Sequence, residues 1–596
     1  MSAREPHWIR PCKRVKIPTR CIFFDTETKT IDSDGTQKML CAVAVYCEYS
    51  FKARTPEPVW LTTVRPEELY LFVVNHTNVR SPLRVLSANI WFDLRVSGML
   101  EYFKKAKWRC NFVYTSSKVF FARFTKGKKA IEFVNIQNYF DNSVAAIGKS
   151  IGLAKIEIDF ESTTQSDLQV YCRRDVEIIY TAFTKFVDYI TKGEIGSIGY
   201  TLPATGYSVY RKSFMKKWIF VHCNEEVTEL ERAAYSGGRC ECFHIGKYTQ
   251  GPYYKLDVNA MYPFVMAREA YPYKLRKIGS DIEVDIIPRI ARRYAYVAHV
   301  TIKTDQPVYA YRTEKQLTFP IGTFQTYLTT GSLDYAFKNN HLQAIHKIAV
   351  YDKEFLFTDY VNHFYSERQR YQKQGNTTFA YVCKLMMNSF YGKFAQRLPE
   401  LISEQESDLN NNYRELIYNV DERCYYVKQS FYGLEQITKL HMIEAPNSIP
   451  VISAHITDYA RLYLWQLCKL AGVKNLYYVD TDSLIVNQAG YNLLKGNIKK
   501  VKMGYLKREG TSSEIEILGL KNYVFDGVHK LKGIPVKHKK LNDNTYEYTF
   551  FPSIQTELRE GYTKDYRIRT VFKSINPEYD KGTVLNTGQV IPLKLS

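Results

Sequence analysis

The sequence lacks the patterns that mark several common structural classes. Its 12 cysteines include no C-x-x-C pair and none follows Cys468, which argues against a zinc ribbon and against a secreted disulfide framework. No apolar run approaches the roughly 20 residues that span a bilayer. No internal repeat or low-complexity segment is visible. We therefore expect a soluble, intracellular protein that makes no membrane contact.

Positive charge and aromatic rings are abundant. Lys and Arg number 82 against 61 Asp and Glu, a formal charge of +21, and this excess favours a polyanionic partner such as nucleic acid. Charge alone leaves a ribosome-associated or membrane-surface protein open. The 48 Tyr and 33 Phe exclude a disordered chain. A length of 596 residues predicts about three to five structural units.

The first part of the chain has the alternating pattern of an α/β unit. Apolar strands are predicted at 21–25, 84–90 and 128–136. From Ser166 to Ile190 the apolar spacing becomes helical, and the Gly-rich stretch from Lys192 to Tyr200 is typical of a linker. We therefore predict one α/β domain ahead of that linker.

The rest of the chain predicts a second α/β region with two insertions. Its expected elements are, in chain order, a strand at 253–263, short strands with Pro and Gly turns over 266–350, helices at 357–373 and 378–396, a polar strand-like stretch at 397–440, a helix at 453–471 and a strand at 475–486. Gln374-Gly375-Asn376, between the two adjacent helices, is typical of a hairpin tip. The predicted fold class is α/β and α+β multidomain.

Two acids at the end of the first predicted strand could share a metal ion. Asp25-Thr26-Glu27 places both carboxylates on one face, because side chains alternate along a strand. Such a pair is also common as a solvated surface feature. Further on, Asp93 follows a second apolar strand, and Tyr171 lies one helical turn before Asp175. Together the four acids would form a cage for two divalent ions that can cleave a phosphodiester.

Three pieces of sequence carry these acids, and they resemble the ExoI, ExoII and ExoIII motifs of DnaQ-like proofreading exonucleases. The pieces are Asp25-Thr26-Glu27, Asn89-Ile90-Trp91-Phe92-Asp93 and Tyr171-Cys172-Arg173-Arg174-Asp175. The resemblance implies that Tyr171 orients the attacking water and that the frayed 3′ end is held by Thr28, Asn89 and Phe92. Lys155 is a further candidate for a catalytic cation, with a plain surface lysine as the alternative.

A second set of acids occupies two other strands. Asp257 ends an apolar strand and is followed by a turn stopped by Pro263, and the run Tyr478-Val479-Asp480-Thr481-Asp482-Ser483 holds two acids inside an apolar strand pair. Acids in such strands are costly unless they are paired or bind metal. We expect Asp257 and Asp482 to meet across a sheet and to hold two Mg²⁺ ions, for which Mn²⁺ could substitute, against a triphosphate.

The run from Lys384 to Lys393 predicts an amphipathic helix whose core face is rich in methionine. Lys384, Asn388 and Tyr391 follow at spacings of four and three, so one face offers a cation to phosphates and a ring to a base. D-x-x-x-x-Y-P, K-x-x-x-N-S-x-Y-G and Y-x-D-T-D-S, in this order, resemble motifs A, B and C of family B DNA polymerases.

The resemblance to family B implies roles for individual residues. The metal ligands would be Asp257, Val258 and Asp482, with Asp480 in support. The incoming nucleotide would contact Val258, Tyr262, Lys373, Lys384, Asn388 and Tyr391, and the ring of Tyr262 would exclude a 2′-hydroxyl. The DNA would contact Tyr235, Gly237 and Gly238 of a Y-x-G-G motif and Lys521 and Tyr523 of a K-x-Y motif. Ala260-Met261 departs from the family's Ser-Leu, which leaves fine nucleotide and template contacts open.

The compact chain resembles the protein-primed branch of that family, found in small bacteriophages, adenoviruses and linear plasmids. Only 24 residues precede Asp25, and two stretches, 266–356 and 397–440, lie where the branch carries its terminal protein regions 1 and 2. The resemblance implies that a terminal protein supplies the priming hydroxyl and that the second region encircles DNA and aids strand displacement. An ordinary primer-dependent enzyme with elaborated palm loops is the alternative.

These motifs predict an RNase H-like 3′-5′ exonuclease domain followed by a right-hand polymerase. The expected domains are the exonuclease (1–190), the palm in two parts (191–265 and 441–525), an insertion resembling terminal protein region 1 (266–356), the fingers (357–396), an insertion resembling terminal protein region 2 (397–440) and the thumb (526–596). The expected partners of this monomer are primer-template DNA, deoxynucleoside triphosphates and a terminal protein.

Two other classes of function stay open. The chain could be a nuclease in which only the first carboxylates act, or a replication scaffold without enzymatic activity. A scaffold gains nothing from acids in apolar strands, which favours an enzyme. A viral enzyme would work in the cytoplasm of its host or in the host's DNA-replication compartment.

Overall fold

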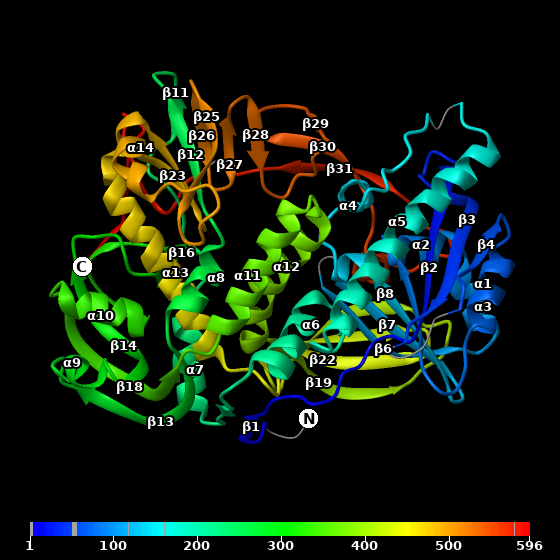
Figure 1. Cartoon of the computed structure of the whole chain (residues 1–596), viewed down its shortest axis with the longest axis horizontal. Helices are drawn as coiled ribbons and strands as arrows, with labels where there is room; N and C mark the ends of the chain where they lie inside the picture. The colour runs from blue at the N-terminus through cyan, green and yellow to red at the C-terminus, as the bar shows by residue number, and fades with distance from the viewer. Residues whose placement is uncertain (1–3, 51–55, 117–118, 160–161, 577) are drawn as a thin grey trace.

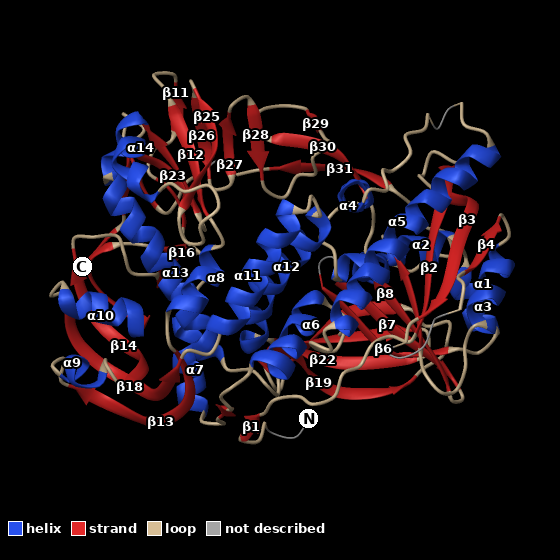
Figure 2. Ribbon diagram, in the orientation of Figure 1, coloured by secondary structure: helices blue, strands red, loops and turns tan. Residues whose placement is uncertain are grey.

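The chain folds into several β-sheets that are separated by long helices (Figures 1 and 2). The computed structural model describes residues 4–50, 56–116, 119–159, 162–576 and 578–596. Residues 4–192 contain a seven-stranded sheet of order β4-β3-β2-β5-β8-β7-β6, which we call the N-terminal unit. Its strands are β2 (Arg20–Thr30), β3 (Gln37–Glu48), β4 (Val59–Thr63), β5 (Leu83–Ser87), β6 (Arg109–Ser116), β7 (Val119–Lys126) and β8 (Lys129–Asn135).

Both faces of the N-terminal unit are covered, because its central strand β2 is apolar on both sides. Cys21 and Phe23 face the long helix α5 (Gln165–Lys192), with the ring of Phe23 5.5 Å from that of Phe183. Ile22 and Phe24 face the opposite layer, α1 (Pro66–Asn75), α2 (Ile90–Val96) and α3 (Met99–Lys105). The hydroxyl of Thr164 caps α5 by accepting a hydrogen bond from the amide of Asp167.

A five-stranded central sheet of order β10-β23-β24-β12-β25 holds the second set of acids. Its strands are β10 (Cys240–Cys242), β12 (Tyr253–Val258), β23 (Leu476–Asp480), β24 (Ser483–Asn487) and β25 (Leu506–Ser512). The mostly buried helix α13 (Pro450–Ala471) and the short helix α8 (Met261–Arg268) belong to the same apolar core as β12, β23 and β24. These strands and helices therefore form one packed unit.

Two antiparallel helices, α11 (Thr358–Lys373) and α12 (Thr377–Ser389), form the hairpin predicted from the sequence. The turn between them is Gln374-Gly375-Asn376, and Asn376 caps α12 by accepting a hydrogen bond from the amide of Phe379. A 3₁₀ helix (Phe390–Ala395) continues α12, so the predicted single helix to residue 396 changes its winding after Ser389. Figure 1 shows this hairpin in the middle of the molecule, between the central sheet and the N-terminal unit.

The first insertion contains long strands, so the prediction of short strands over 266–350 is wrong. Its sheet has the order β13-β18-β14-β17-β34, with β13 (Tyr271–Ile282), β14 (Tyr294–Thr304), β17 (Ile321–Thr329) and β18 (Leu342–Glu354). Two register shifts between β13 and β18 bend this pair, and β-bulges let Pro272 lie within a strand. The strand β34 (Lys594–Leu595) joins this sheet from the other end of the sequence.

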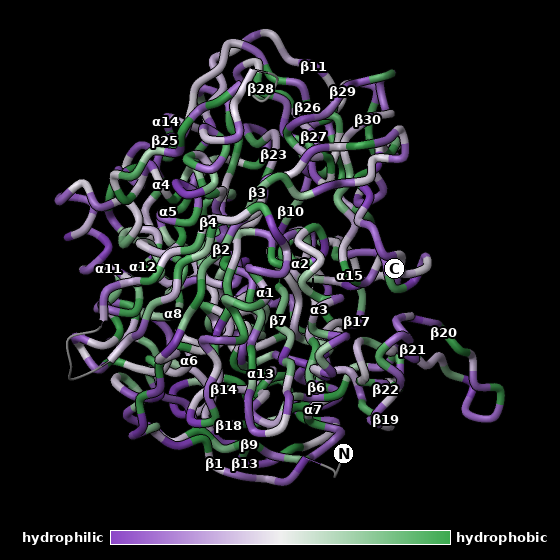
Figure 3. The backbone as a smooth tube through the Cα atoms, turned by 90° about the vertical axis from the view of Figure 1, so that its right-hand side faces the viewer, coloured by the Kyte–Doolittle hydropathy of each residue, from purple (hydrophilic) through white to green (hydrophobic). Residues whose placement is uncertain are grey.

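The second insertion is a four-stranded antiparallel sheet, as the strand-like pattern at 397–440 predicts. Its order is β19-β22-β21-β20, with β19 (Arg397–Glu406), β20 (Tyr413–Asn419), β21 (Cys424–Phe431) and β22 (Leu434–Glu444). The hairpin of β20 and β21 projects from the body of the molecule (Figure 3). Leu416, Ile417 and Val420 are 60%, 41% and 75% exposed there.

The C-terminal segment, residues 526–576 and 578–596, crosses the molecule from the central sheet to the N-terminal unit and back. It contains a small sheet of β29 (Lys539–Lys540), β30 (Thr545–Phe550) and β31 (Arg569–Ser574), and the helix α15 (Ile554–Glu560). Ile554, Leu558 and Tyr566 join the apolar core of the N-terminal unit. Phe431 and Tyr432 of the second insertion join the same core. Three parts of the sequence therefore share one interior.

Candidate active sites

The first carboxylate pair lies within β2. Asp25 and Glu27 point to the same face, and β2 continues through Thr30, so the acids sit inside the strand and not at its end as predicted. Ligand atoms of Asp25, Glu27 and Cys172 all lie within 4.8 Å of one another. The thiol of Cys172 donates to the carbonyl oxygen of Asp25 at 3.4 Å. Sequence reasoning missed Cys172, although it lies between Tyr171 and Asp175 on α5.

Asp93 lies in the first turn of α2 and is held from two sides. Its Oδ1 accepts a hydrogen bond from Thr26 at 2.7 Å, and its Oδ2 accepts one from Ser87 at 2.7 Å. Burial raises the pKa of Asp93 to about 6, although these hydroxyl donors favour the charged form. The carboxylate is therefore fixed beside β2, close enough for its charge to raise the pKa of Asp25.

Asp175, Lys155 and Tyr171 form the third side of the site. Lys155 makes an ion pair with Oδ2 of Asp175, and its ammonium lies 4.5 Å from the centre of the Tyr171 ring. Although burial disfavours the charged ammonium, hydrogen bonds to Asp175 and Tyr171 hold the pKa of Lys155 above its ordinary value. Oδ1 of Asp175 is buried and has no hydrogen-bond partner in the part of the chain that the structure describes.

The charges of this cluster fit a bound cation. Burial and the neighbouring carboxylates raise the pKa of Glu27 to about 8 and that of Asp25 well above its ordinary range. Like charges this close are stable together only when a cation or a proton neutralises them. Together with the partnerless Oδ1 of Asp175, this set of hard oxygen donors suits Mg²⁺ or Mn²⁺.

The predicted residues for the frayed 3′ end lie around the same cluster. The hydroxyl of Thr28 donates to Oε1 of Gln37 at 3.0 Å. Asn89 precedes α2 as its capping residue, and its carbonyl accepts a hydrogen bond from the amide of Asp93 at 3.1 Å. Phe92 is half-buried on α2, where two aromatic rings from the C-terminal segment pack against it. Each of the three is thus close in sequence to one of the first carboxylates: Thr28 follows Glu27 on β2, and Asn89 and Phe92 precede Asp93 at the start of α2.

The second set of acids meets where β12 and β24 pair. Asp257 lies opposite Ser483, and the amide of Val258 donates to the carbonyl of Asp482 at 2.8 Å. Val258 itself is fully buried. After β12, Ala260 adopts a left-handed conformation (φ 51°) and starts α8, so Pro263 lies inside a helix and does not stop a turn as predicted.

The acids of the second set influence one another strongly. Burial and the charge of Asp482 raise the pKa of Asp257 to about 7, while Lys507 and Lys384 oppose the shift. Burial and the charge of Asp480 raise the pKa of Asp482. Asp480 differs from both, because Lys521 donates to its Oδ1 at 2.8 Å. Asp257 and Asp482 are therefore the two carboxylates of this set that lack a lysine partner among the described hydrogen bonds.

The helical hairpin and its 3₁₀ continuation carry four of the six predicted nucleotide-binding residues. Lys384 is exposed on α12, and its charge opposes the rise in the pKa of both Asp257 and Asp482. Oδ1 of Asn388 is buried, with no hydrogen-bond partner among the residues described. The rings of Tyr262 and Tyr391 stack at 5.4 Å with an interplanar angle of 8°. Lys373 ends α11 at the hairpin tip. Lys384 lies on α12 about seven residues, or roughly 10 Å, from the start of that helix.

The predicted DNA-binding residues flank the central sheet. Buried Arg461 holds the Y-x-G-G segment by donating to the carbonyls of Ser236 (2.6 Å) and Gly237 (2.9 Å). A methyl group on Gly238 would lie 3.1 Å from the hydroxyl of Tyr262. Tyr235, just before this segment, is largely buried, and its carbonyl accepts a hydrogen bond from Arg312.

Lys521 and Tyr523 lie beside the second set of acids, next to Asp480. The ring of Tyr523 packs 5.0 Å from that of Tyr478, and the amide of Lys521 donates to the Tyr478 hydroxyl at 2.8 Å. Both residues are thereby fixed beside Asp480. Sequence reasoning missed Arg461, whose only signal is a cation on a mostly apolar helix.

The sequence matches the model of a known protein family. The model for DNA polymerase type B, organellar and viral, matches residues 110–469, which is more than half of the chain. The chain belongs to this family. The match includes β12 with Asp257 and the whole helical hairpin with Lys384, Asn388 and Tyr391.

Several DNA polymerases are similar in sequence. A probable DNA polymerase of Neurospora intermedia is 24% identical over 441 residues, which is 70% of this chain and 43% of that protein. A DNA polymerase of Kluyveromyces lactis is 24% identical over 428 residues, 67% of this chain and 41% of that protein. The DNA-directed DNA polymerase of Enterobacteria phage PRD1 is 26% identical over 303 residues, half of each chain. The matches thus span less than half of the two longer relatives.

The fold is that of the Phi29 DNA polymerase. Its structure in complex with primer-template DNA and incoming nucleotide superposes with a TM-score of 0.61 at 15% identity, covering 95% of this chain and 93% of that one. The complex of the same protein with single-stranded DNA gives a TM-score of 0.61 over 87% and 90% of the two chains. This likeness confirms the predicted fold class, an exonuclease domain followed by a right-hand polymerase fold.

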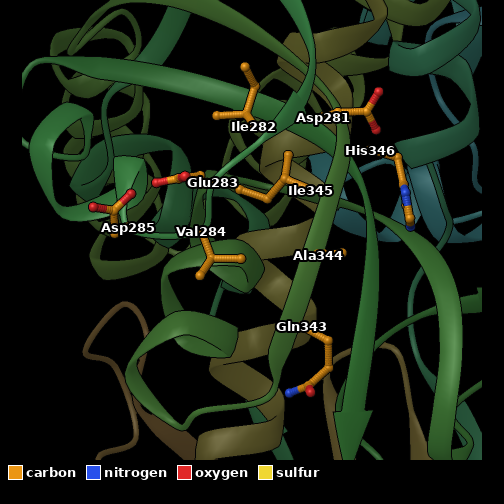
Figure 4. Close-up of a pocket in the computed structure, with 9 residues that line it drawn as sticks. All are labelled: Asp281, Ile282, Glu283, Val284, Asp285, Gln343, Ala344, Ile345 and His346. Carbon is orange, nitrogen blue, oxygen red and sulfur yellow. The ribbon is translucent and has the colours of Figure 1, made fainter.

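One hollow of the surface lies away from both carboxylate sets. It measures about 480 Å³ and opens on the first insertion, between the turn before α9 (Ile286–Ile290) and the strand β18 (Figure 4). Its walls are Asp281, Ile282, Glu283, Val284, Asp285, Gln343, Ala344, Ile345 and His346.

Among the described residues, no helix is both long and apolar enough to cross a membrane.

Proposed function

We propose that this chain is a template-directed DNA polymerase with a 3′-5′ proofreading exonuclease. The observation that carries the proposal is the meeting of Asp257 and Asp482 beside Lys384, with the pKa of Asp257 raised to about 7 by burial and by Asp482. Two half-buried acids facing an exposed cation on a neighbouring helix suit the binding of a metal–triphosphate complex. We infer six domains in seven segments of the chain, with the boundaries that the motifs predict.

Each site would hold two Mg²⁺ ions, or Mn²⁺ in their place. In the polymerase site the ligands would be Asp257, the backbone of Val258, and Asp482; in the exonuclease site they would be Asp25, Glu27, Asp93 and Asp175. The ions supply charge neutralisation for the phosphate and activation of the attacking oxygen. We expect each site to be inactive without divalent ions.

In the polymerase site, the chain's own residues would select and orient the nucleotide. Lys384 contributes positive charge to the phosphates, with Lys373 as a second contact from the hairpin tip. The stacked rings of Tyr262 and Tyr391 form a flat wall, on which Tyr262 excludes a 2′-hydroxyl. The buried amide of Asn388 offers an acceptor to the nucleotide or to its partner. Lys521 and Tyr523, beside Asp480, would contact the primer strand.

In the exonuclease site, Tyr171 and Lys155 would orient the attacking water and stabilise the developing negative charge. Lys155 is already fixed by Asp175 and by the face of Tyr171, so little reorganisation is needed during the reaction. Thr28, Asn89 and Phe92 would hold the 3′ end. Tyr235, Gly237 and Gly238 would guide the strand between the two sites.

We further propose that replication starts from the hydroxyl of a terminal protein and proceeds with strand displacement by a monomer. The two insertions support this, because each is a sheet of its own added to the helices and central sheet that carry the acids. The alternative is a primer-dependent enzyme in which both insertions serve DNA binding alone. Transfer of labelled nucleotide to a co-encoded candidate terminal protein is the test, and no labelled protein with any neighbouring gene product would favour the alternative.

Substitution of the polymerase acids tests the main proposal. Asp257→Ala or Asp482→Ala should reduce Mg²⁺-dependent extension of a primed template by roughly a thousandfold or more, since each removes a metal ligand. Removal of 3′ nucleotides should persist in both variants and would show that they are folded. Asp543→Ala, at a fully exposed side chain, is the matched control. Extension that survives Asp257→Ala would overturn the proposal.

A further inference from the structure

The C-terminal segment is bonded to α2, the helix that carries Phe92 and Asp93. Arg95 on α2 donates to Glu557 at 3.1 Å, to the hydroxyl of Tyr562 at 2.9 Å and to the carbonyl of Thr563 at 2.6 Å. The side chains of Arg95 and Glu557 are only 2% and 9% exposed. A buried, fully bonded ion pair of this kind fixes the relative position of the two elements. The segment around α15 is therefore a rigid neighbour of Phe92 and Asp93.

One tyrosine of this segment supports two of the three residues proposed to hold the 3′ end. The ring of Tyr566 is 2% exposed and meets the ring of Phe92 edge to face at 5.3 Å. Its carbonyl accepts a hydrogen bond from the amide of Gln37 at 2.9 Å, and the side chain of Gln37 accepts one from Thr28 at 3.0 Å. Tyr566 thus contacts Phe92 directly, and it is linked to Thr28 by hydrogen bonds through Gln37.

A second ring of the segment lies beside Phe92 and is open to solvent. Phe551 is 49% exposed, and its ring centre is 6.1 Å from that of Phe92 at an interplanar angle of 71°. The hydroxyl of Tyr566 donates to the carbonyl of Pro552 at 2.9 Å, which holds the backbone next to Phe551. A large ring that is held in place but half exposed leaves part of its surface open to a stacking base.

We propose that Phe551 and Phe92 together form the surface on which the bases of a frayed 3′ strand stack, with Tyr566 as a positioning residue. The inference rests on the proposed exonuclease function. Aromatic stacking tolerates any base, which suits a site that must accept every mispaired nucleotide. The single strand would then be held by residues from both ends of the sequence, and the 3′-end site would be incomplete without the C-terminal segment.

Kinetics of 3′-end removal from a single-stranded oligonucleotide test the role of Phe551. Phe551→Ala should raise KM roughly five- to hundredfold and change kcat by less than about twofold, since one stacking contact is lost and the carboxylates are untouched. Phe551→Tyr should restore the KM. Phe572→Ala, at a 66% exposed ring on β31, is the matched control and should behave as the wild type.

Tyr566 has a separate test. Tyr566→Phe keeps the ring against Phe92 and should retain most of the activity, whereas Tyr566→Leu should raise KM as Phe551→Ala does. A fall in kcat without a change in KM in Tyr566→Leu would instead indicate damage to the carboxylates and would overturn the positioning role. Extension of a correctly paired primer should be unchanged in these variants, which reports on folding.

The outcomes separate this inference from the proposed function. The Asp25→Ala, Glu27→Ala double variant should abolish 3′-end removal. If it does, and Phe551→Ala has the KM of the wild type, the exonuclease stands and the stacking surface is overturned. An equal rise in KM for Phe572→Ala would also overturn it. Absence of 3′-end removal by the wild-type protein would overturn both.

Discussion

The carboxyl group of Glu27 illustrates how burial keeps an acid of the first site neutral until a cation binds. Its pKa is raised from 4.5 to about 8 by burial and by Asp175, so the folded protein favours the neutral form in this range. The unfolded chain ionises near 4.5, and this group therefore lowers the free energy of unfolding as the pH rises from about 4.5 to about 8. A divalent ion reverses that effect because it stabilises the charged form.

Metal should therefore stabilise the protein more at higher pH. We expect Mg²⁺ to raise Tm by several degrees at about pH 8.5 and by much less at about pH 6, relative to the protein in EDTA. Thermal unfolding followed by calorimetry or fluorescence measures this. The Asp25→Asn, Glu27→Gln double variant should show a smaller metal-dependent shift at about pH 8.5. A shift of the same size at both pH values in the wild type would contradict the prediction.

Two adjacent glycines provide a matched pair at the polymerase site. A methyl on Gly238 would lie 3.0 Å from Cγ2 of Thr481 and 3.1 Å from the hydroxyl of Tyr262, whereas a methyl on Gly237 would meet no described atom within 4 Å. Gly238→Ala should displace the Tyr262 ring and raise KM for the incoming nucleotide roughly tenfold. Gly237→Ala should leave this KM unchanged. Steady-state incorporation of a single nucleotide distinguishes the two, and equal KM values would contradict the steric argument.

At the scale of elements, the acids of the second set lie near the ends of strands of the central sheet. The sequence predicts the strand of Asp257, the hairpin of Asp482 and the helical hairpin of Lys384, because each has a strong local pattern of apolar residues and turn residues. It does not predict the four long strands of the first insertion. Their apolar pattern is interrupted by prolines, glycines and bulges, and β34 comes from the far end of the chain.

The projecting hairpin of the second insertion offers a test of its own. Tyr418, Val420 and Tyr425 at its tip are 48%, 75% and 47% exposed, so removal of this tip uncovers little core. We expect replacement of residues 418–425 by two glycines, which would join Ile417 to its strand partner Tyr426, to leave extension on a primed single strand nearly intact. The length made per binding event and synthesis through duplex DNA should fall severalfold. Primed single-stranded circles with and without a downstream strand measure this, and unchanged product lengths would contradict the assignment.

At the scale of the whole molecule, the interior of the N-terminal unit is shared with two distant segments. Leu558 and Tyr432 lie in the same apolar core as Phe24 and Leu94, although they are hundreds of residues away in sequence. The sequence predicted the four carboxylates of the first site from their motifs, but it carries no local signal for these partners. Tyr566 is one tyrosine among 48, and only the tertiary structure distinguishes it.

Loss of one C-terminal side chain should therefore destabilise the opposite end of the chain. Leu558→Ala should cost about 2–5 kcal/mol of local stability, because it leaves a cavity in a closely packed core. Hydrogen exchange should become faster in β2 and α2 and stay unchanged in the first insertion. Leu541→Ala, at a 44% exposed position of the same segment, is the control. Unchanged protection of α2 would contradict the shared core.

The net charge predicts how the molecule responds to salt. With a formal charge of +21, DNA binding should depend mainly on phosphate contacts. If about 6–10 phosphates are neutralised, the affinity should fall roughly 10³- to 10⁵-fold between about 50 and 200 mM salt. Fluorescence anisotropy with labelled primer-template measures the slope. A nearly flat dependence would show that apolar and base contacts dominate.

The shared interior of the N-terminal unit should also limit how the gene for this chain can recombine with that of a relative. A single crossover after residue 192 would join one parent's β2 and α2 to the other parent's α15 and Tyr566. Side chains that contact each other in one core, such as Arg95 and Glu557, would then come from different parents. Viable chimeras should need two crossovers that move residues 1–192 and 550–568 together. Shuffled libraries should therefore retain the two segments from the same parent.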